Sequence, residues 1–138
     1  MTTKYITKTI LKIDTNGDGT VDTVTQIRNV GPLSENRPML DVTTLDSTRR
    51  EYRPGLPDSG ELTFEANYDS TSHAALHGLI LEDGTATACQ LEMLDADGTN
   101  ESLTFKCWFN EWTLQNFEPD NTVTAAVKAK ITDAITGY

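Results

Sequence analysis

The sequence predicts a single domain that is mainly β, built from antiparallel strands in a sandwich or barrel with one flanking α-helix. Three observations predict it. Apolar and polar residues alternate along much of the chain, threonine is abundant in the alternating stretches, and short turns with Asn-Gly, Asp-Gly or proline separate them. The chain has 138 residues, a usual size for one hydrophobic core, so we expect one domain over residues 1–138.

The first predicted element is an N-terminal hairpin over about residues 4–30. Its flanks, YITKTILKI at 5–13 and VDTVTQI at 21–27, are rich in β-branched residues, as strands are. Between them, TNGDG at 15–19 contains Asn-Gly and Asp-Gly, which tolerate the positive φ that a tight hairpin turn requires. The stretch is therefore typical of a turn between two strands.

The same turn begins like a calcium-binding EF-hand loop. Asp14, Asn16 and Asp18 alternate, a glycine follows, and Asp22 comes four residues after Asp18. An EF-hand also needs a bidentate glutamate at its twelfth position and helices on both sides. Here Thr25 holds that position, and the flanks predict strands. We favour the turn, and a weak calcium site formed by these four residues is the alternative.

After a further strand, the sequence predicts a long inter-subunit loop over about residues 44–60. Connections in compact domains are usually about 4–6 residues long, so this one needs an explanation. It holds Arg49, Arg50 and Arg53, three of the five arginines in the chain, together with Tyr52. Arginine and tyrosine are enriched at protein interfaces. On such an acidic chain we expect these four residues to contact another copy; a mobile, solvated loop is the alternative.

A strand and the helix come next. The segment ELTFEANY at 61–68 alternates cleanly, with its apolar residues on one face and its glutamates on the other. In STSHAALHGLILEDG, leucine and isoleucine recur at helical spacing after a Ser/Thr cluster and before a glycine, which predicts a helix over about 71–82. Four more strands are expected after it, separated by turns at 82–85, 95–100 and 118–121.

The composition excludes several classes of protein. The formal net charge is −10 and the isoelectric point is near 4.4. Affinity for nucleic acid comes mostly from lysine and arginine, so a DNA- or RNA-binding module is disfavoured, as is an electrostatic membrane binder. The sequence has no apolar run near the roughly 18 residues that cross a bilayer, and its start lacks the apolar core of a secretory signal. We expect assembly in a reducing cytoplasm and no contact with membrane.

The residues that often carry chemistry form no recognisable active site. His73 and His77 share one face of the predicted helix, but no HExxH pattern or third ligand accompanies them, so exposed helix histidines are expected. Cys89 and Cys107 lie on apolar sides of alternating segments and form no CxxC motif, so buried free thiols are expected. The sequence contains no GxSxG, P-loop or GxGxxG motif. We expect no catalytic residue and no cofactor.

Two segments resemble the major tail protein, or tail tube protein, of siphophages. The first is PMLDVTTLDSTRREYRPGLPDSGELTFEANYD at 38–69, and the second is EWTLQNFEPDNTVTAAVKAKITDAI at 111–135. In the family, a strand ending in D/E-V-T-x-x-D-S is followed by an Arg-Glu and an aromatic residue, then by PGLxDxGE and a strand ending in NYD. The predicted helix also falls where the family places its substantial one. The likeness spans roughly residues 38–136, and the N-terminal hairpin is less typical.

The resemblance implies a tail-tube fold and a structural, non-enzymatic role in the virion tail. Subunits of that family form hexameric rings that stack into a hollow tube, through which the phage genome is delivered. The long loop typically reaches neighbouring subunits or rings, in line with the interface expected for the arginine-rich loop. The implied partners are other copies of the chain, the tape-measure protein, a tail terminator and tail-tip proteins, with assembly in the host bacterial cytoplasm. DNA would pass through the lumen without specific binding.

An acidic chain suits such a tube, because an anionic lining repels phosphate over about 8–10 Å at physiological ionic strength. Glu61 and Glu65 oppose the apolar face of their strand and are the candidates for lumen-facing acids. The alternative is that they are ordinary solvated or inter-subunit positions. Two other functions stay open from the sequence: an extracellular calcium-binding adhesion-type β domain, and the tube protein of a contractile tail or secretion system.

Overall fold

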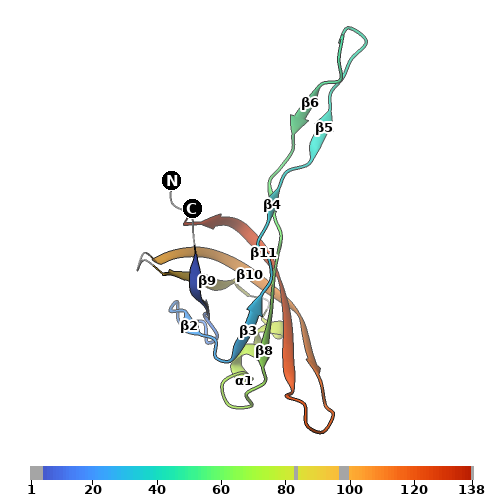
Figure 1. The fold of residues 1–138 in the computed structure, drawn as a ribbon. Coiled ribbons are helices and arrows are strands. Elements are labelled where there is room, and N and C mark those ends of the chain that lie inside the picture. The colour runs from blue at the N-terminus through green and yellow to red at the C-terminus, as the bar shows by residue number, and fades with distance from the viewer. Residues whose placement is uncertain (1–4, 83, 97–99, 138) are drawn as a thin grey trace.

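The computed structural model describes residues 5–82, 84–96 and 100–137, and its largest element is an antiparallel sheet of seven strands. The sheet curls into a half-barrel (Figure 1), which confirms the predicted mainly β, antiparallel, barrel-like fold. From one edge to the other, the strands are β2 (Asp22–Thr23), β1 (Ile6–Ile13), β9 (Thr87–Asp95), β10 (Asn100–Gln115), β11 (Thr124–Thr136), β8 (Glu61–Asn67) and β3 (Ile27–Val30).

The hydrophobic core lies inside the curl. Side chains of a strand alternate between its two faces, so every second residue of the long strands is buried. The core is closed by Leu76 and Leu79, which come from the helical segment and not from the sheet. The buried apolar residues of the strands are Leu11 and Ile13 in β1, Leu62, Phe64 and Ala66 in β8, Cys89 and Leu91 in β9, Leu103, Phe105, Cys107 and Phe109 in β10, and Ala125, Val127, Ala129, Ile131 and Ile135 in β11.

The helical segment is shorter than the predicted 71–82. It consists of α1 (Ala74–Gly78) and a 3₁₀ turn, η1 (Leu79–Leu81). Before it, one carboxylate oxygen of Asp69 accepts the backbone N–H groups of residues 71 and 72, which lowers the pKa of Asp69 and holds this stretch in a turn. Glycine is a poor helix former, and the α-helix ends at Gly78. No helix in the described part of the chain is long and apolar enough to cross a membrane.

The predicted N-terminal hairpin over about 4–30 is divided between the two edges of the sheet. β1 pairs with β2 only through Lys12 and Ile13, on either side of the turn that carries the Asn-Gly and Asp-Gly sequences. β3 leaves this hairpin and pairs with β8 at the opposite edge, across the width of the sheet. The outer edge of β3 and the outer edge of β1 before Lys12 pair with no strand among the described residues.

Three strands, and not the predicted four, follow the helix in the described residues. β10 is one continuous strand of 16 residues, because a bulge between Phe109 and Glu111 lets it bend without ending. The bulge shifts the alternation, so Trp112 continues the inward face that Phe109 leaves. The predicted turns at 82–85 and 95–100 include Asp83 and residues 97–99, which lie outside the described residues.

Between β3 and β8 the chain leaves the body as a long two-stranded arm (Figure 1). Two short antiparallel ladders build it: β4 (Glu35–Asn36) pairs with β7 (Asp58–Ser59) near the body, and β5 (Met39–Asp41) pairs with β6 (Tyr52–Pro54) further out. The predicted loop at 44–60 is therefore only the tip and the returning limb of this arm. The outgoing limb, residues 31–43, is its other half.

His73 fastens the helical segment to the body. Its side chain is buried, and its Nε2 lies 2.9 Å from the backbone oxygen of Thr25. The backbone N–H of Asp69 donates to its Nδ1 at 3.3 Å, so Nε2 carries the proton and donates to Thr25. His77, one turn on, is exposed and packs edge-on against the Trp112 ring. Of the two predicted exposed histidines, only His77 is exposed, because His73 satisfies both ring nitrogens inside the fold.

Replacing His73 by alanine should destabilise the domain by about 1–3 kcal/mol, because the Thr25 carbonyl loses its partner in a buried place. His77→Ala is the matched control, and it should cost clearly less because that ring is exposed. Urea unfolding followed by tryptophan fluorescence measures both. Equal losses for the two variants would contradict this account of His73.

Candidate functional site: a projecting arm

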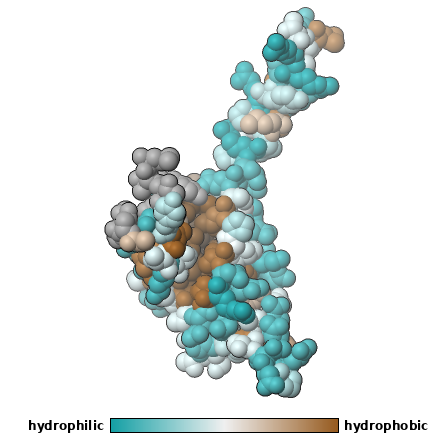
Figure 2. Space-filling model, viewed as in Figure 1, coloured by the Kyte–Doolittle hydropathy of each residue, from teal (hydrophilic) through white to brown (hydrophobic). Residues whose placement is uncertain are grey.

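The arm exposes apolar side chains that a free protein would bury. Leu45 at its tip is fully exposed, Leu56 is 86% exposed and Met39 is 62% exposed. Figure 2 shows an apolar residue at the far end of the arm, well away from the body. Among the described residues twelve large hydrophobic ones are exposed, and half of them belong to the arm: Met39, Leu40, Val42, Leu45, Tyr52 and Leu56. An isolated two-stranded hairpin is at best marginally stable in water, so this arm has the properties of a contact surface.

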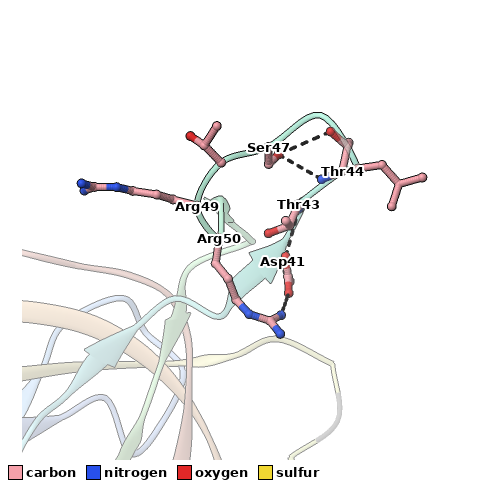
Figure 3. A pocket seen from close by; sticks show the side chains of 8 residues that line it. Asp41, Thr43, Thr44, Ser47, Arg49 and Arg50 are labelled. Atoms are coloured by element: carbon pink, nitrogen blue, oxygen red, sulfur yellow. Dashed lines mark hydrogen bonds and ion pairs between the residues drawn. The ribbon is translucent and has the colours of Figure 1, made fainter.

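The tip of the arm, residues 41–51, is held by a network of its own polar groups (Figure 3). Asp41 accepts the backbone N–H of Thr43 at 2.9 Å and the guanidinium of Arg50 at 2.9 Å. Ser47 accepts the N–H of Thr44 at 3.1 Å, and the Glu51 N–H donates to the Thr43 hydroxyl at 2.8 Å. The hydrogen bonds from Thr43, and then Arg50, hold the pKa of Asp41 below its usual range. The tip is therefore a shaped loop and not a loose one.

The structure places all four predicted contact residues on the arm, but in different situations. Arg49 extends away from the tip and has no ion pair with any described residue (Figure 3). The Arg50 guanidinium instead pairs with Asp41, so it shapes the tip. Tyr52 and Arg53 lie on β6, both exposed. Arg49, Tyr52 and Arg53 are thus available to a partner, while Arg50 is partly engaged.

The root of the arm is fixed to the sheet by Lys130 of β11. Its Nζ donates to the Ser59 carbonyl at 2.7 Å and lies 3.2 Å from a carboxylate oxygen of Asp58. Glycines allow close approach here: a Cβ on Gly31 would collide with the Thr63 side chain of β8, and one on Gly60 with that of Ser34 in the other limb. The limbs therefore leave the body close together, with the returning limb held against β11.

The candidate lumen-facing acids lie on the face of the sheet opposite the core. Glu61 is exposed and pairs in register with Lys130, while Glu65 is partly buried within 3.4 Å of the Asn29 amide. Sequence reasoning missed that lysines share this face, because neighbours in the sheet come from distant parts of the chain. Within the described strands the face carries five lysines and four glutamates: Lys8, Lys12, Lys106, Lys128 and Lys130, with Glu61, Glu65, Glu92 and Glu111.

Several of these charges are paired across the strands. Lys12 lies 3.2 Å from Glu92, and Lys128 lies 3.3 Å from Glu111, directly opposite it. The negative net charge of the chain is therefore not concentrated on this face. It comes mainly from the turns, because the five acids of the arm are nearly balanced by its four arginines.

The turn at 14–22 engages its own side-chain oxygens. The two carboxylate oxygens of Asp14 accept the N–H groups of Gly17 at 2.9 Å and Gly19 at 3.0 Å, and Asn16 accepts that of Asp18 at 3.2 Å. Both glycines have positive φ, at 75° and 86°, as the turn requires. In the described part of the chain, no three His, Cys, Asp or Glu side chains gather in a way that suits a metal ion. These contacts account for the motif as a turn.

The two cysteines meet in the core. Their sulfur atoms are 3.4 Å apart, between neighbouring strands β9 and β10, and both are free and buried, as the alternation predicted. The hydrogen bond with Cys107, reinforced by burial, raises the pKa of Cys89 well above its usual range. At neutral pH Cys89 is therefore a protonated, unreactive thiol with a packing role.

Comparison with known proteins gives a family match and several structural matches. A sequence model of the family described as "Phage tail tube, TTP, lambda-like" matches residues 1–135. No curated protein sequence matches the chain. A chain of the anti-feeding prophage baseplate, in a 6-fold symmetrised structure, has a TM-score of 0.78 at 12% identity, covering 99% of this chain and 98% of that one.

Two further solved structures share the fold. A chain from the sheath/tube terminator of an extracellular contractile injection system has a TM-score of 0.75 at 12% identity, covering 99% of this chain and 96% of that one. The SPP1 tail tube has a TM-score of 0.66 at 7% identity, covering 95% of this chain and 76% of that one. At such identities these likenesses establish the fold alone.

Lys130→Met should speed hydrogen exchange of the Gly60 amide, which donates to Ser34 in the root, because the arm loses its tether to β11. The stability of the body should fall by no more than about 1 kcal/mol, since the Lys130–Asp58 pair is exposed. Lys128→Met, which breaks an ion pair on the same strand without touching the arm, is the control. Unchanged exchange at Gly60 in Lys130→Met would contradict the tether.

Proposed function

This chain belongs to the family of lambda-like phage tail tube proteins, and we propose that its copies form hexameric rings stacked into the hollow tail that delivers the genome. It is a structural protein of the virion tail. The single observation that carries the proposed assembly is the arm, which projects six exposed apolar side chains that no described part of its own chain covers. Burial of such side chains is the main driving force of association, so the arm needs a partner.

The edges of the sheet support the same proposal. β3 and most of β1 leave one side of their backbone unpaired among the described residues, and exposed edges invite pairing with other chains. A groove of about 450 Å³ lies between these edges, with Ile6 on one side and Arg28 on the other. The core residue Leu91, and Met93 packed against the core, also line this groove. Joining sheets between copies would complete the edges and cover the groove. The 6-fold symmetry of the anti-feeding prophage baseplate supports six copies in a ring.

We assign the four predicted contact residues to this assembly in unequal roles. Arg49, Tyr52 and Arg53 are proposed to contact neighbouring copies directly, and Arg50 to shape the tip through Asp41. The remaining partners are proposed from the family: the tape-measure protein inside the tube, a terminator at one end and tail-tip proteins at the other. Assembly is proposed to take place in the host bacterial cytoplasm, without a catalytic activity or a cofactor.

The contractile-tube alternative has a specific observation in its favour. The sheath/tube terminator of an extracellular contractile injection system shares the fold over 99% of this chain. The family match favours the long, flexible tail of lambda-like phages. A tube that copurifies with a sheath protein from phage lysates would favour the contractile alternative.

We further propose that the face of β8 and β11 bearing Glu61 and Glu65 lines the lumen. Because Lys128 and Lys130 share it, this lining would be charge-balanced and not purely anionic. DNA would then pass because no continuous basic stripe offers it a binding track, and Lys128 and Lys130 are each paired with an acid, Glu111 and Asp58. Specific binding of DNA is not expected.

Electron microscopy of the purified full-length protein tests the assembly. Negative staining should show rings or tubes with six-fold end views, because the arm and the sheet edges are complementary to other copies. The matched variant lacks the tip, with Val42 joined to Glu51 through Gly-Gly, and it should remain folded but form no stacked tubes. A wild-type protein that stays outside the tail tube of the virion, located by immunogold labelling, would contradict the proposed function.

Reversing both glutamates should slow genome passage. Glu61→Lys with Glu65→Lys leaves the core face of β8 untouched, so tubes should form, but the lining becomes strongly basic and retains DNA. Glu61→Gln with Glu65→Gln is the milder control. The rate of DNA release from virions, followed with an intercalating dye, is the measurement. Wild-type release from the lysine variant would remove these residues from the lumen.

A further inference from the structure

We propose that the tip of the arm docks into a recess at the opposite end of a second copy of this chain, between the turn at 14–22 and helix α1. This inference rests on the proposed function, because it names the surface that receives the arm. Leu45 enters the recess, Arg49 pairs with Glu82, and Asp46 pairs with Lys106.

The tip presents one apolar side chain beside two opposite charges. Leu45 is fully exposed, and Asp46 and Arg49 are exposed on the same short loop. Within the described residues neither charge has an ion pair or a side-chain hydrogen bond. Arg49 reaches away from the loop (Figure 3), while the network around Asp41 and Ser47 holds the loop in shape. A pre-shaped loop loses little conformational entropy on docking.

The recess has room for such a side chain. It measures about 590 Å³ and lies between the turn at 14–22, the helical segment and the start of β9. Small residues line it, among them Ala75, Gly78 and Ala86, together with the core residue Leu79. Apart from its chain neighbours and the backbone of its own helix, no atom lies within 4 Å of the place where a Cβ on Gly78 would stand, so the surface is open there.

The charges that line the recess are opposite to those of the tip. Glu82 and Lys106 both contribute to its lining. One oxygen of Glu82 accepts the Gly84 N–H at 2.9 Å, and Lys106 is exposed without an ion pair to any described residue. Asp14 also lines the recess, but its two carboxylate oxygens already accept the N–H groups of Gly17 and Gly19. The charges that remain for a partner are therefore one acid and one base, and they meet a tip that carries one base and one acid beside Leu45. Such complementarity selects the partner and fixes its register.

The two surfaces lie at opposite ends of the molecule. In Figure 1 the arm projects upward from the body, and α1 lies at the bottom. A contact between two different surfaces repeats from copy to copy, and it continues along an axis if the rotation does not close it. The contact therefore joins copies head to tail and gives the stack a direction.

Charge exchange in the full-length protein tests this docking. Arg49→Glu and Glu82→Arg should each lower the yield of tubes about tenfold or more, measured by sedimentation and electron microscopy. The double variant Arg49→Glu/Glu82→Arg should recover most of the yield, because the pair is restored with its signs exchanged. The mismatched control Arg49→Glu/Lys106→Glu should not recover.

A second pair keeps the test decisive if Glu82→Arg fails to fold. Asp46→Lys and Lys106→Glu should each reduce tube yield, and their combination should restore it; neither side chain holds a described part of its own chain in place. Thermal melting verifies folding of every variant.

The outcomes separate this inference from the proposed function. Wild-type tubes with unaffected Arg49→Glu and Asp46→Lys variants would overturn the docking and leave the tube function standing. Losses that neither exchange restores would show that the tip binds elsewhere, and would also overturn it. A wild-type protein that is absent from the virion tail would overturn the function and the docking together.

Discussion

One constraint governs the structure: the hydrophobic core lies entirely in the body, and the arm has no core of its own. The curled sheet and the helical segment bury a complete set of apolar residues, while the arm is only two short ladders carrying six exposed large ones. Burying each of these fully is worth about 1.5–3 kcal/mol. A two-stranded arm without its own core gains that stabilisation only from another molecule. The apolar residues of the body are therefore buried on folding, and those of the arm on assembly.

The polar groups decide where the arm points and what its tip presents. Lys130 fixes the root to β11, and Asp41 closes the tip around Arg50 and Thr43. Both ends of the arm are therefore ordered before any partner arrives, which lowers the entropic cost of association. Arg49 is left free at the tip by the same arrangement that engages Arg50.

The sequence predicted correctly those features that depend on residues close together in the chain. The alternation of β8 and β11, the turn at 14–22 and the buried cysteines follow from neighbouring residues, and the structure has them. The arm was half predicted: the loop at 44–60 stood out by its length and arginines, but its partner limb at 31–43 pairs with it only through contacts across the sequence. The lysines beside Glu61 were missed for the same reason, and His73 because burial of a histidine depends on distant Thr25.

The near-equal numbers of lysines and glutamates on the outer face of the sheet have a consequence for the working range of a tube lined by it. A lining with a large excess of charge of one sign would interact with DNA with a strength that depends on the salt concentration. Where opposite charges cancel within a few ångströms, this interaction depends far less on the salt concentration. A virion with such a lining would release its contents at similar speed in fresh water and in brine.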